Sequence, residues 1–316
     1  MERIKKANNS TIAEAAHILR AGGLVAFPTE TVYGLGADAT NGTAVARIFE
    51  AKGRPRFNPL IVHVIGLDAA RLFAEFDGKS IALAEQCWPG PLTLVLPLRR
   101  NQLISELVTA GLDTVAIRVP SHPIAQQLLH LADRPIAAPS ANKSGHVSPT
   151  RAQHVSCDLK GEVDMILDGG KATAGLESTI IELCPEPALL RPGAYPREEL
   201  EAIIGCKLPR RRENTIRSPG QLKSHYAPRA ALRLNAMDFL PGEALLGFGP
   251  HAPKNALNLS RAGDLREAAG NLFAYLRALD AEHPERIAVM PIPETGLGEA
   301  INDRLRRAAA PREHKR

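Results

Sequence analysis

Residues 24–36 read LVAFPTETVYGLG, and this stretch decides the fold. Its first four residues form an unbroken apolar run that stops at Pro28, which is the pattern of a strand buried on both faces. The remainder places hydroxyls, a carboxylate and a phenol in a glycine-rich segment directly after that strand. Open α/β sheets bind ligands where their strands end, so the sequence predicts a ligand-binding turn over residues 28–36.

Helix and strand patterns alternate on both sides of this stretch. Apolar residues recur at helical spacing from about residue 11 to residue 22, and further helices are predicted over residues 42–51 and around 67–87. Short apolar runs predict strands over residues 60–65, 92–96, 114–119, 136–138, 165–167, 178–183 and 188–190. This order predicts an α/β domain with a large, twisted, mixed sheet over residues 1–205.

The pattern changes after that domain. Residues 206–229 combine arginines, prolines and glycine without any core-facing stripe, which predicts a linker. Residues 230–316 then predict a strand over 244–248, a helix from Asp264, a strand over 287–290 and a last helix from Glu299. That order is typical of a small, doubly wound, Rossmann-like α/β domain.

Composition excludes several classes of protein. No run of eighteen apolar residues occurs, and the first nine residues are mostly polar and charged with no hydrophobic region after them. We therefore expect no membrane span, no secretory signal and a cytoplasmic location. The four cysteines are far apart and form no Cys-x-x-Cys pair, which argues against a disulfide framework or a thiolate zinc site. The net charge of +5 is concentrated at residues 210–212 and 304–316, where solvated surface is a better interpretation than RNA contact.

Common catalytic motifs are absent. Gly78-Lys79-Ser80 lacks the upstream glycine and the buried strand of a P-loop, and Gly247-Phe248-Gly249 matches a dinucleotide fingerprint only loosely. No His-Glu-x-x-His zinc helix and no Gly-x-Ser-x-Gly elbow occurs. Metalloprotease and α/β-hydrolase functions therefore have no support in the sequence.

Two loops carry groups that suit a polyphosphate. Lys52 and Arg54 precede Pro55 on a stiff loop. The lysine ammonium is a point charge and the arginine guanidinium is a planar, two-pronged donor, so the two can bind different oxygens of one triphosphate. The segment 139–145 leaves another short strand and offers hydroxyl, amide and backbone donors. Taken singly, each loop is more often an exposed basic loop or an ordinary turn.

Taken together, these segments resemble the YrdC-like family of threonylcarbamoyl-AMP synthases. The resemblance rests on residues 28–36, Lys52-x-Arg54 with Asn58-Pro59, His63, Ser140-x-Asn142 and Arg191-Pro192-Gly193, and it covers about residues 10–205. Ser218-Pro219-Gly220 and His225-Tyr226-x-Pro228 resemble the linker of the longer, two-domain form of this enzyme.

The resemblance implies an enzyme that converts L-threonine, bicarbonate and ATP into threonylcarbamoyl-AMP and pyrophosphate for tRNA modification. It assigns Lys52 and Arg54 to catalysis, and it implies Mg²⁺ bound with ATP, transferase proteins that act downstream and no dedicated metal site in the protein. The implied ATP-binding residues are Lys52, Arg54, Asn58, Thr114, Ser140, Asn142, Arg191 and Tyr226, the last of them on a linker that acts as a lid. The implied threonine-binding residues are Thr31, His63, Arg118, Ala138 and Ser178.

Two other hypotheses stay open at this point. A carbamoyltransferase of the hydrogenase-maturation type shares a similar domain, but its Cys-x-x-Cys zinc motifs are missing here and the chain is short for it. An RNA-binding or ribosome-associated module would suit the basic balance. Aromatic residues amount to only 4% of the chain, which leaves few stacking platforms for single-stranded RNA.

Overall fold

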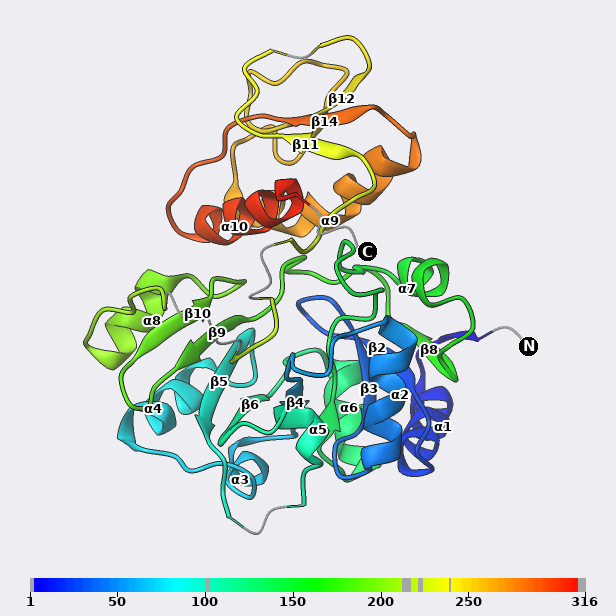
Figure 1. The fold of residues 1–316 in the computed structure, drawn as a ribbon, viewed down its shortest axis with the longest axis vertical. Coiled ribbons are helices and arrows are strands. Elements are labelled where there is room, and N and C mark those ends of the chain that lie inside the picture. Colours follow the sequence, from blue (N-terminus) through cyan, green and yellow to red (C-terminus); the bar gives the residue numbers. More distant parts are fainter. Residues whose placement is uncertain (1–2, 101–102, 212–216, 221–223, 239, 312–316) are drawn as a thin grey trace.

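The computed structural model describes residues 3–100, 103–211, 217–220, 224–238 and 240–311, which form a large and a small α/β unit (Figure 1). The described strands of the large unit form one ten-stranded mixed sheet in the order β1-β8-β2-β3-β7-β4-β6-β5-β9-β10. Its strands are β1 Ile4–Lys6, β2 Val25–Pro28, β3 Tyr33–Asp38, β4 Ile61–His63, β5 Leu92–Pro97, β6 Thr114–Arg118, β7 Ile136–Ala137, β8 Met165–Asp168, β9 Thr179–Glu182 and β10 Ala188–Arg191. A large mixed sheet confirms the fold class predicted for this unit.

Helices cover both faces of this sheet. The side chains of residues 24–27 point alternately to the two faces of the sheet. Val25 and Phe27 pack with α1 and α6 on one face. Leu24 and Ala26 belong to the core on the other face, with α2 and α5. Strand burial on both faces is therefore confirmed. The helices are α1 Asn9–Arg20, α2 Gly42–Lys52, α3 Leu67–Ala70, α4 Gly78–Cys87, α5 Glu106–Thr109, α6 Pro123–Ala132, α7 Ala152–Leu159 and α8 Arg197–Ile204.

The predicted turn over residues 28–36 is wrong in its second half. Residues 33–38 form β3, which runs antiparallel to β2 and pairs Gly36 with Val25 and Gly34 with Phe27. A Cβ atom on Gly36 would lie 2.8 Å from the ring of Phe27 and 3.0 Å from Ile136. This glycine is needed for close packing inside a strand, and only residues 29–32 make the turn.

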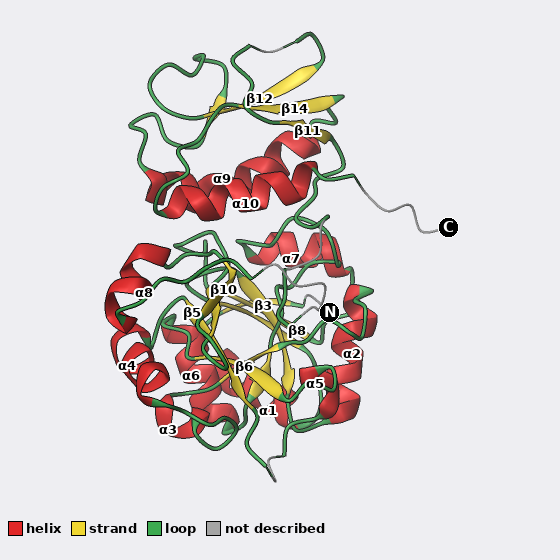
Figure 2. Cartoon of the chain, turned by 60° about the vertical axis from the view of Figure 1, so that its left-hand side comes forward, coloured by secondary structure: helices red, strands yellow, loops and turns green. Residues whose placement is uncertain are grey.

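The small unit has a four-stranded sheet in the order β11-β14-β12-β13, and all of its described pairings are parallel. Both helices lie on the face that points to the large unit (Figures 1 and 2), whereas a doubly wound domain has helices on both faces. Among the described residues, only the β12-to-β14 connection and the segment after β14 are helical, so no helix covers the other face. The elements are β11 Ala231–Arg233, β12 Glu243–Gly247, β13 Leu257–Asn258, β14 Arg286–Val289, α9 Leu265–Ala281 and α10 Leu297–Ala309.

The two units share a continuous apolar core. Val32, Val147 and Leu176 of the large unit belong to the same buried cluster as Phe273 of α9. Gly175 approaches the backbone of α9 so closely that a Cβ atom there would lie 2.5 Å from a carbonyl oxygen. The small unit is therefore packed against the large one rather than tethered at a distance.

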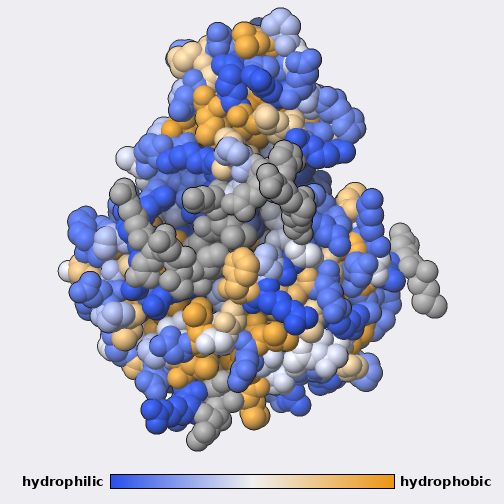
Figure 3. Space-filling model, in the orientation of Figure 1, coloured by the Kyte–Doolittle hydropathy of each residue, from blue (hydrophilic) through white to orange (hydrophobic). Residues whose placement is uncertain are grey.

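Arginines of the two basic clusters are mostly paired with carboxylates. Arg210 contacts Glu299 at 3.0 Å, Arg211 pairs with the buried Glu182, and Arg306 contacts Glu294 at 2.7 Å. Arg212 and residues 312–316 lie outside the described residues. The face in Figure 3 is mostly hydrophilic, with apolar residues gathered in the lower middle of the large unit and in the small unit. No helix within the described ranges is long and apolar enough to cross a membrane.

Candidate active site

A cavity opens at the turn after β2, between the large sheet and the linker. Its wall includes residues from the strand ends, from segment 138–140 and from linker residues 219–220 and 225–226. Nine of the residues predicted from the sequence line it: Thr31, Arg54, His63, Arg118, Ala138, Ser140, Ser178, Arg191 and Tyr226. The structure therefore brings residues from distant parts of the chain to one place.

Lys52 lies behind the cavity wall and holds part of it in place. It ends α2, and Gly53 follows in the left-handed conformation with φ of 59°, which turns the chain sharply toward Arg54. The Lys52 Nζ donates to the carbonyl oxygens of Ser140 and Asn142, each at 2.5 Å. Burial, followed by the charge of Arg54, holds the pKa of Lys52 well below its usual value.

Arg54 presents a guanidinium whose position is set by its own loop. Its Nε donates to the carbonyl of Asn58 at 3.1 Å and its Nη2 donates to that of Pro59 at 2.8 Å. Burial, with a contribution from Arg191, lowers the pKa of Arg54 to about 9, so the group is still a cation at neutral pH. Among the described residues, the guanidinium of Arg54 bonds to two carbonyls and to no carboxylate, and a buried cation of this kind is suited to binding an anion.

Two buried asparagines have polar atoms without partners. Neither side-chain amide atom of Asn58 has a hydrogen-bond partner among the described residues, and the Oδ1 of Asn142 also lacks one. Both side chains are at most 1% exposed. Buried polar groups in proteins are nearly always hydrogen-bonded, so such atoms indicate a site that a ligand completes.

Arg191 connects the sheet to the linker. Its Nη2 donates to the carbonyl and the hydroxyl of Ser178, at 2.9 and 3.2 Å, and its Nη1 donates to the carbonyl of Pro219 at 3.3 Å. The Ser178 hydroxyl also lies 2.7 Å from that of Thr93. This network fixes a second cation at the cavity wall.

Arg118, which also lines the cavity, forms a buried ion pair with Glu30. Arg118 Nη2 lies 2.6 Å from Glu30 Oε1, and Arg118 Nε donates to the carbonyl of Gly90 at 3.3 Å. Glu30 also accepts a hydrogen bond from the backbone of Ser121 at 3.1 Å. Sequence reasoning assigned no role to Glu30, although it lies in the stretch that decides the fold.

His63 is buried beside this pair. Burial, with Arg118 as the second cause, lowers the pKa of His63 to about 3. The imidazole is therefore neutral at physiological pH, and it can accept or donate a hydrogen bond but does not add a positive charge.

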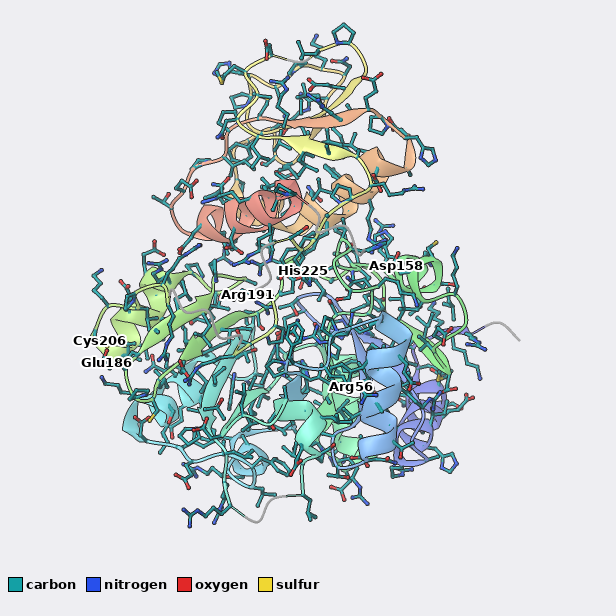
Figure 4. The ribbon with its side chains drawn as sticks, viewed as in Figure 1. Arg56, Asp158, Glu186, Arg191, Cys206 and His225 are labelled. Atoms are coloured by element: carbon teal, nitrogen blue, oxygen red, sulfur yellow. The ribbon has the colours of Figure 1, made fainter. Side chains whose placement is uncertain are left out.

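The linker closes the cavity. His225 and Arg191 lie at the junction of the two units (Figure 4), and the ring of Tyr226 is buried against Phe273 with 5.7 Å between centroids. Backbone hydrogen bonds hold the residues on both sides of Tyr226. The N–H of Ala227 donates to the carbonyl of Gly145 at 2.9 Å, and the N–H of His225 donates to the carbonyl of Arg307 at 3.2 Å. The free volume left is about 40 Å³, far below the roughly 300–1,000 Å³ of small-molecule sites. The linker must move before a nucleotide can enter.

Some predicted residues do not line the cavity. Lys52, Asn58 and Asn142 lie behind its wall, where they hold or continue the lining segments. Thr114 begins β6, the strand that ends at Arg118, and lies roughly 13 Å along the strand from the cavity end. The structure does not bring Thr114 to the cavity. Glu177 lines it but was not predicted, because nothing in its local sequence distinguishes it from other acidic residues.

A twisted mixed sheet that carries a cationic cavity, closed by the linker to a small α/β unit, defines a two-domain protein of the YrdC-like fold. A family model described as telomere recombination, for the Sua5, YciO and YrdC proteins, matches residues 17–193. A second one, described as the C-terminal domain of threonylcarbamoyl-AMP synthase, matches residues 195–310. The chain belongs to the Sua5 branch of this family, which has both domains.

Individual relatives agree with this assignment. The chain is 43% identical to the threonylcarbamoyl-AMP synthase of Pyrococcus abyssi, over 93% of each chain. It is 42% identical to the Bacillus subtilis protein of the same name, over 96% of this chain and 94% of the other. The solved structure of P. abyssi Sua5 complexed with L-threonine superposes with a TM-score of 0.87 at 40% identity, and it covers 97% of this chain and 96% of that one.

The lowered pKa of His63 makes stability depend on pH. The imidazole binds protons below about pH 6.5 in the unfolded chain but only near pH 3 in the folded protein. The free energy of unfolding is therefore highest above pH 6.5. As the pH falls toward 3, protonation of this imidazole in the unfolded chain lowers that free energy by at most about 1.4 kcal/mol per pH unit. Denaturant titrations between pH 7 and pH 4.5 should show a shallower decline for His63→Gln than for the unmodified protein. Parallel curves would contradict the assignment.

Proposed function

We propose that this protein makes threonylcarbamoyl-AMP and pyrophosphate from L-threonine, bicarbonate and ATP. The proposal is supported above all by one juxtaposition: Arg54 and Arg191 lie in the same cavity as the small polar side chains of Thr31 and Ser178. Homologues of similar length are named threonylcarbamoyl-AMP synthase, and the neighbouring P. abyssi structure holds L-threonine. Once the linker has moved, a triphosphate can lie beside a small amino acid in this cavity.

The chemistry requires positioning and charge stabilisation. The threonine amine attacks the carbon of bicarbonate and water leaves, which gives an N-carboxylated amino acid. A carboxylate oxygen of that group then attacks the α-phosphorus of ATP and displaces pyrophosphate. The result is a mixed anhydride, so the reaction is a nucleotidyl transfer. Negative charge spreads over phosphate and carboxylate oxygens in the transition state, and preorganised cations and donors in a closed site stabilise it.

We infer separate roles for the two sides of the cavity. Arg54 and Arg191, with the hydroxyl of Ser140, contact the phosphates, and Lys52 holds the 140–142 segment in place for them. Arg118, held by Glu30, faces the carboxylate of threonine, and the neutral His63 with Thr31 binds its polar groups. These assignments follow from the charge and placement of each group around the cavity.

Magnesium enters this proposal as part of the substrate. The described residues contain no group of three His, Cys, Asp or Glu side chains that could hold a metal ion. The carboxylate that lines the cavity, Glu177, is bound to Arg304 at 2.8 Å. MgATP, in which the phosphates carry the ion, therefore suits the cavity better than a metal held by the protein. Proteins that transfer the threonylcarbamoyl group to tRNA would act on the product.

Pyrophosphate release tests the proposal directly. With MgATP, we expect release to require both L-threonine and bicarbonate, and we expect serine to be a weaker substrate because it lacks the methyl group that threonine can bury. Release with carbamoyl phosphate in place of both would favour the carbamoyltransferase alternative. Tight RNA binding without any turnover would favour a binding module.

A further inference from the structure

One buried arginine of the small domain reaches the wall of the catalytic cavity. Arg304 lies on α10 and is 0% exposed, and its Nε donates to Glu177 Oε2 at 2.8 Å. Glu177 lines the cavity, and its other oxygen accepts a hydrogen bond from Ser148 at 2.5 Å. The ion pair thus connects the last helix of one domain to the catalytic wall of the other.

The same guanidinium lies over the linker tyrosine. Its central carbon is 4.9 Å from the centroid of the Tyr226 ring, whose other neighbours include Phe273 and His225. The Nη1 of Arg304 donates to Asp303 at 2.8 Å, and the Nη2 has no hydrogen-bond partner among the described residues. Tyr226 therefore contacts an arginine and an aromatic ring that both come from the small domain.

From these contacts we propose that Arg304 is a positioning residue for ATP use: it holds Tyr226 over the cavity and neutralises Glu177 in the cavity wall. The proposal rests on the function proposed above, and it gives the C-terminal domain a part in that reaction. Arg304 acts through Tyr226 and Glu177 rather than by touching the substrate.

The charge of Glu177 is the reason why neutralisation matters. Burial alone would raise the pKa of Glu177, but Arg304 and then Arg191 outweigh it, so the pKa is lowered and the carboxylate is ionised. Without Arg304, a buried negative charge with less compensation would face the triphosphate. Like charges in a low-dielectric site repel strongly, so the affinity for ATP should fall.

Two separable effects are expected for Arg304→Met. The first is on the linker: loss of the cation–π contact and of the ion pair should increase amide hydrogen exchange in residues 224–230 about tenfold. The second is on charge: KM for ATP should rise about tenfold, while kcat changes less. Adding Glu177→Gln to Arg304→Met should bring KM for ATP back to the original value or below. Amide hydrogen exchange in residues 224–230 should stay fast in this double variant.

Arg277→Met is the matched control. Arg277 also extends from the small domain, on α9, and contacts Asp158 at 2.5 Å and the carbonyl of Ser148 at 3.4 Å, but it does not line the cavity. The substitution loosens the same interface without removing a direct contact to Tyr226 or Glu177. Arg277 bonds to the main-chain carbonyl of Ser148, whereas the Ser148 hydroxyl is the group that bonds Glu177. We expect unchanged KM for ATP and unchanged linker exchange in this variant. Arg304→Lys, which keeps the charge, should show a smaller rise in KM than Arg304→Met.

Several outcomes would overturn the proposal. Equal effects of Arg277→Met and Arg304→Met on linker exchange would show that Arg304 only stabilises the interface. Failure of Glu177→Gln to restore KM would refute the charge argument, and the double variant keeps this test valid if Arg304→Met alone folds poorly. Should the intact protein release no pyrophosphate with threonine and bicarbonate, the proposed function fails, yet hydrogen exchange and the calorimetric affinity for MgATP still decide the role of Arg304.

Discussion

Arg54→Ala is expected to lower kcat/KM for ATP about 100-fold, because it removes a preorganised cation from the place where negative charge develops. Arg54 is 8% exposed, and its guanidinium bonds only to the carbonyls of Asn58 and Pro59 among the described residues. Removing a cation that has no carboxylate partner leaves no charge unpaired, so the fold should survive. Steady-state pyrophosphate release and a thermal melt measure the two effects.

The matched control for this variant lies two residues further along the same loop. Arg56 is exposed, and Figure 4 shows it on the large domain, below the junction with the small one. Arg56→Ala removes the same charge from the loop and should change kcat/KM less than threefold, since exposed charges are screened by water and salt. Similar losses for both variants would mean that the general charge of the loop matters, and the assignment of Arg54 to the phosphates would be wrong.

Arg118→Leu is expected to abolish measurable use of threonine and to lower the free energy of unfolding by about 3 kcal/mol. The first effect follows from losing the guanidinium that faces the threonine carboxylate. The second follows because Glu30, whose side chain is 12% exposed, keeps its charge without a partner. Denaturant titration and pyrophosphate release at varied threonine concentration measure the two quantities.

A double variant separates these effects. Glu30→Gln combined with Arg118→Leu removes both charges, so stability should recover by more than half, while threonine use stays lost. If threonine use returned in the double variant, Arg118 would be a structural partner of Glu30 and would not bind substrate.

Much of the fold could be predicted from local pattern. The apolar run at residues 24–27 identified a strand buried on both faces because each face of the sheet carries helices. The glycines at 34 and 36 misled the prediction, since a glycine marks a turn and a tightly packed strand equally well in sequence. Ile136 and Phe27, which leave no room for a side chain at Gly36, become its neighbours only when distant strands pair.

The candidate site could be predicted only in part. Lys52, Arg54 and Ser140 were found through the combination of short motifs, and the structure brings their segments together. That Lys52 bonds to two carbonyls behind the wall depends on tertiary packing and has no sequence signal. The interpretation of residues 304–316 as solvated surface is wrong for Arg304, which is 0% exposed. Its partner Glu177 is 127 residues away in the chain, so no local pattern shows the pair.

The closed linker has a further consequence for how strongly the protein binds nucleotide. A molecule whose Tyr226 already covers the cavity cannot accept ATP, so before binding, the linker competes with the nucleotide. The loosening of the linker expected for Arg304→Met would by itself favour ATP, and the rise in KM expected for that variant comes from the uncompensated charge of Glu177. The affinity measured in a titration is then the intrinsic affinity multiplied by the fraction of open molecules. A closed fraction of about 99% would weaken the apparent affinity roughly 100-fold. A compound that binds the closed form alone would therefore inhibit the protein without resembling any of its substrates.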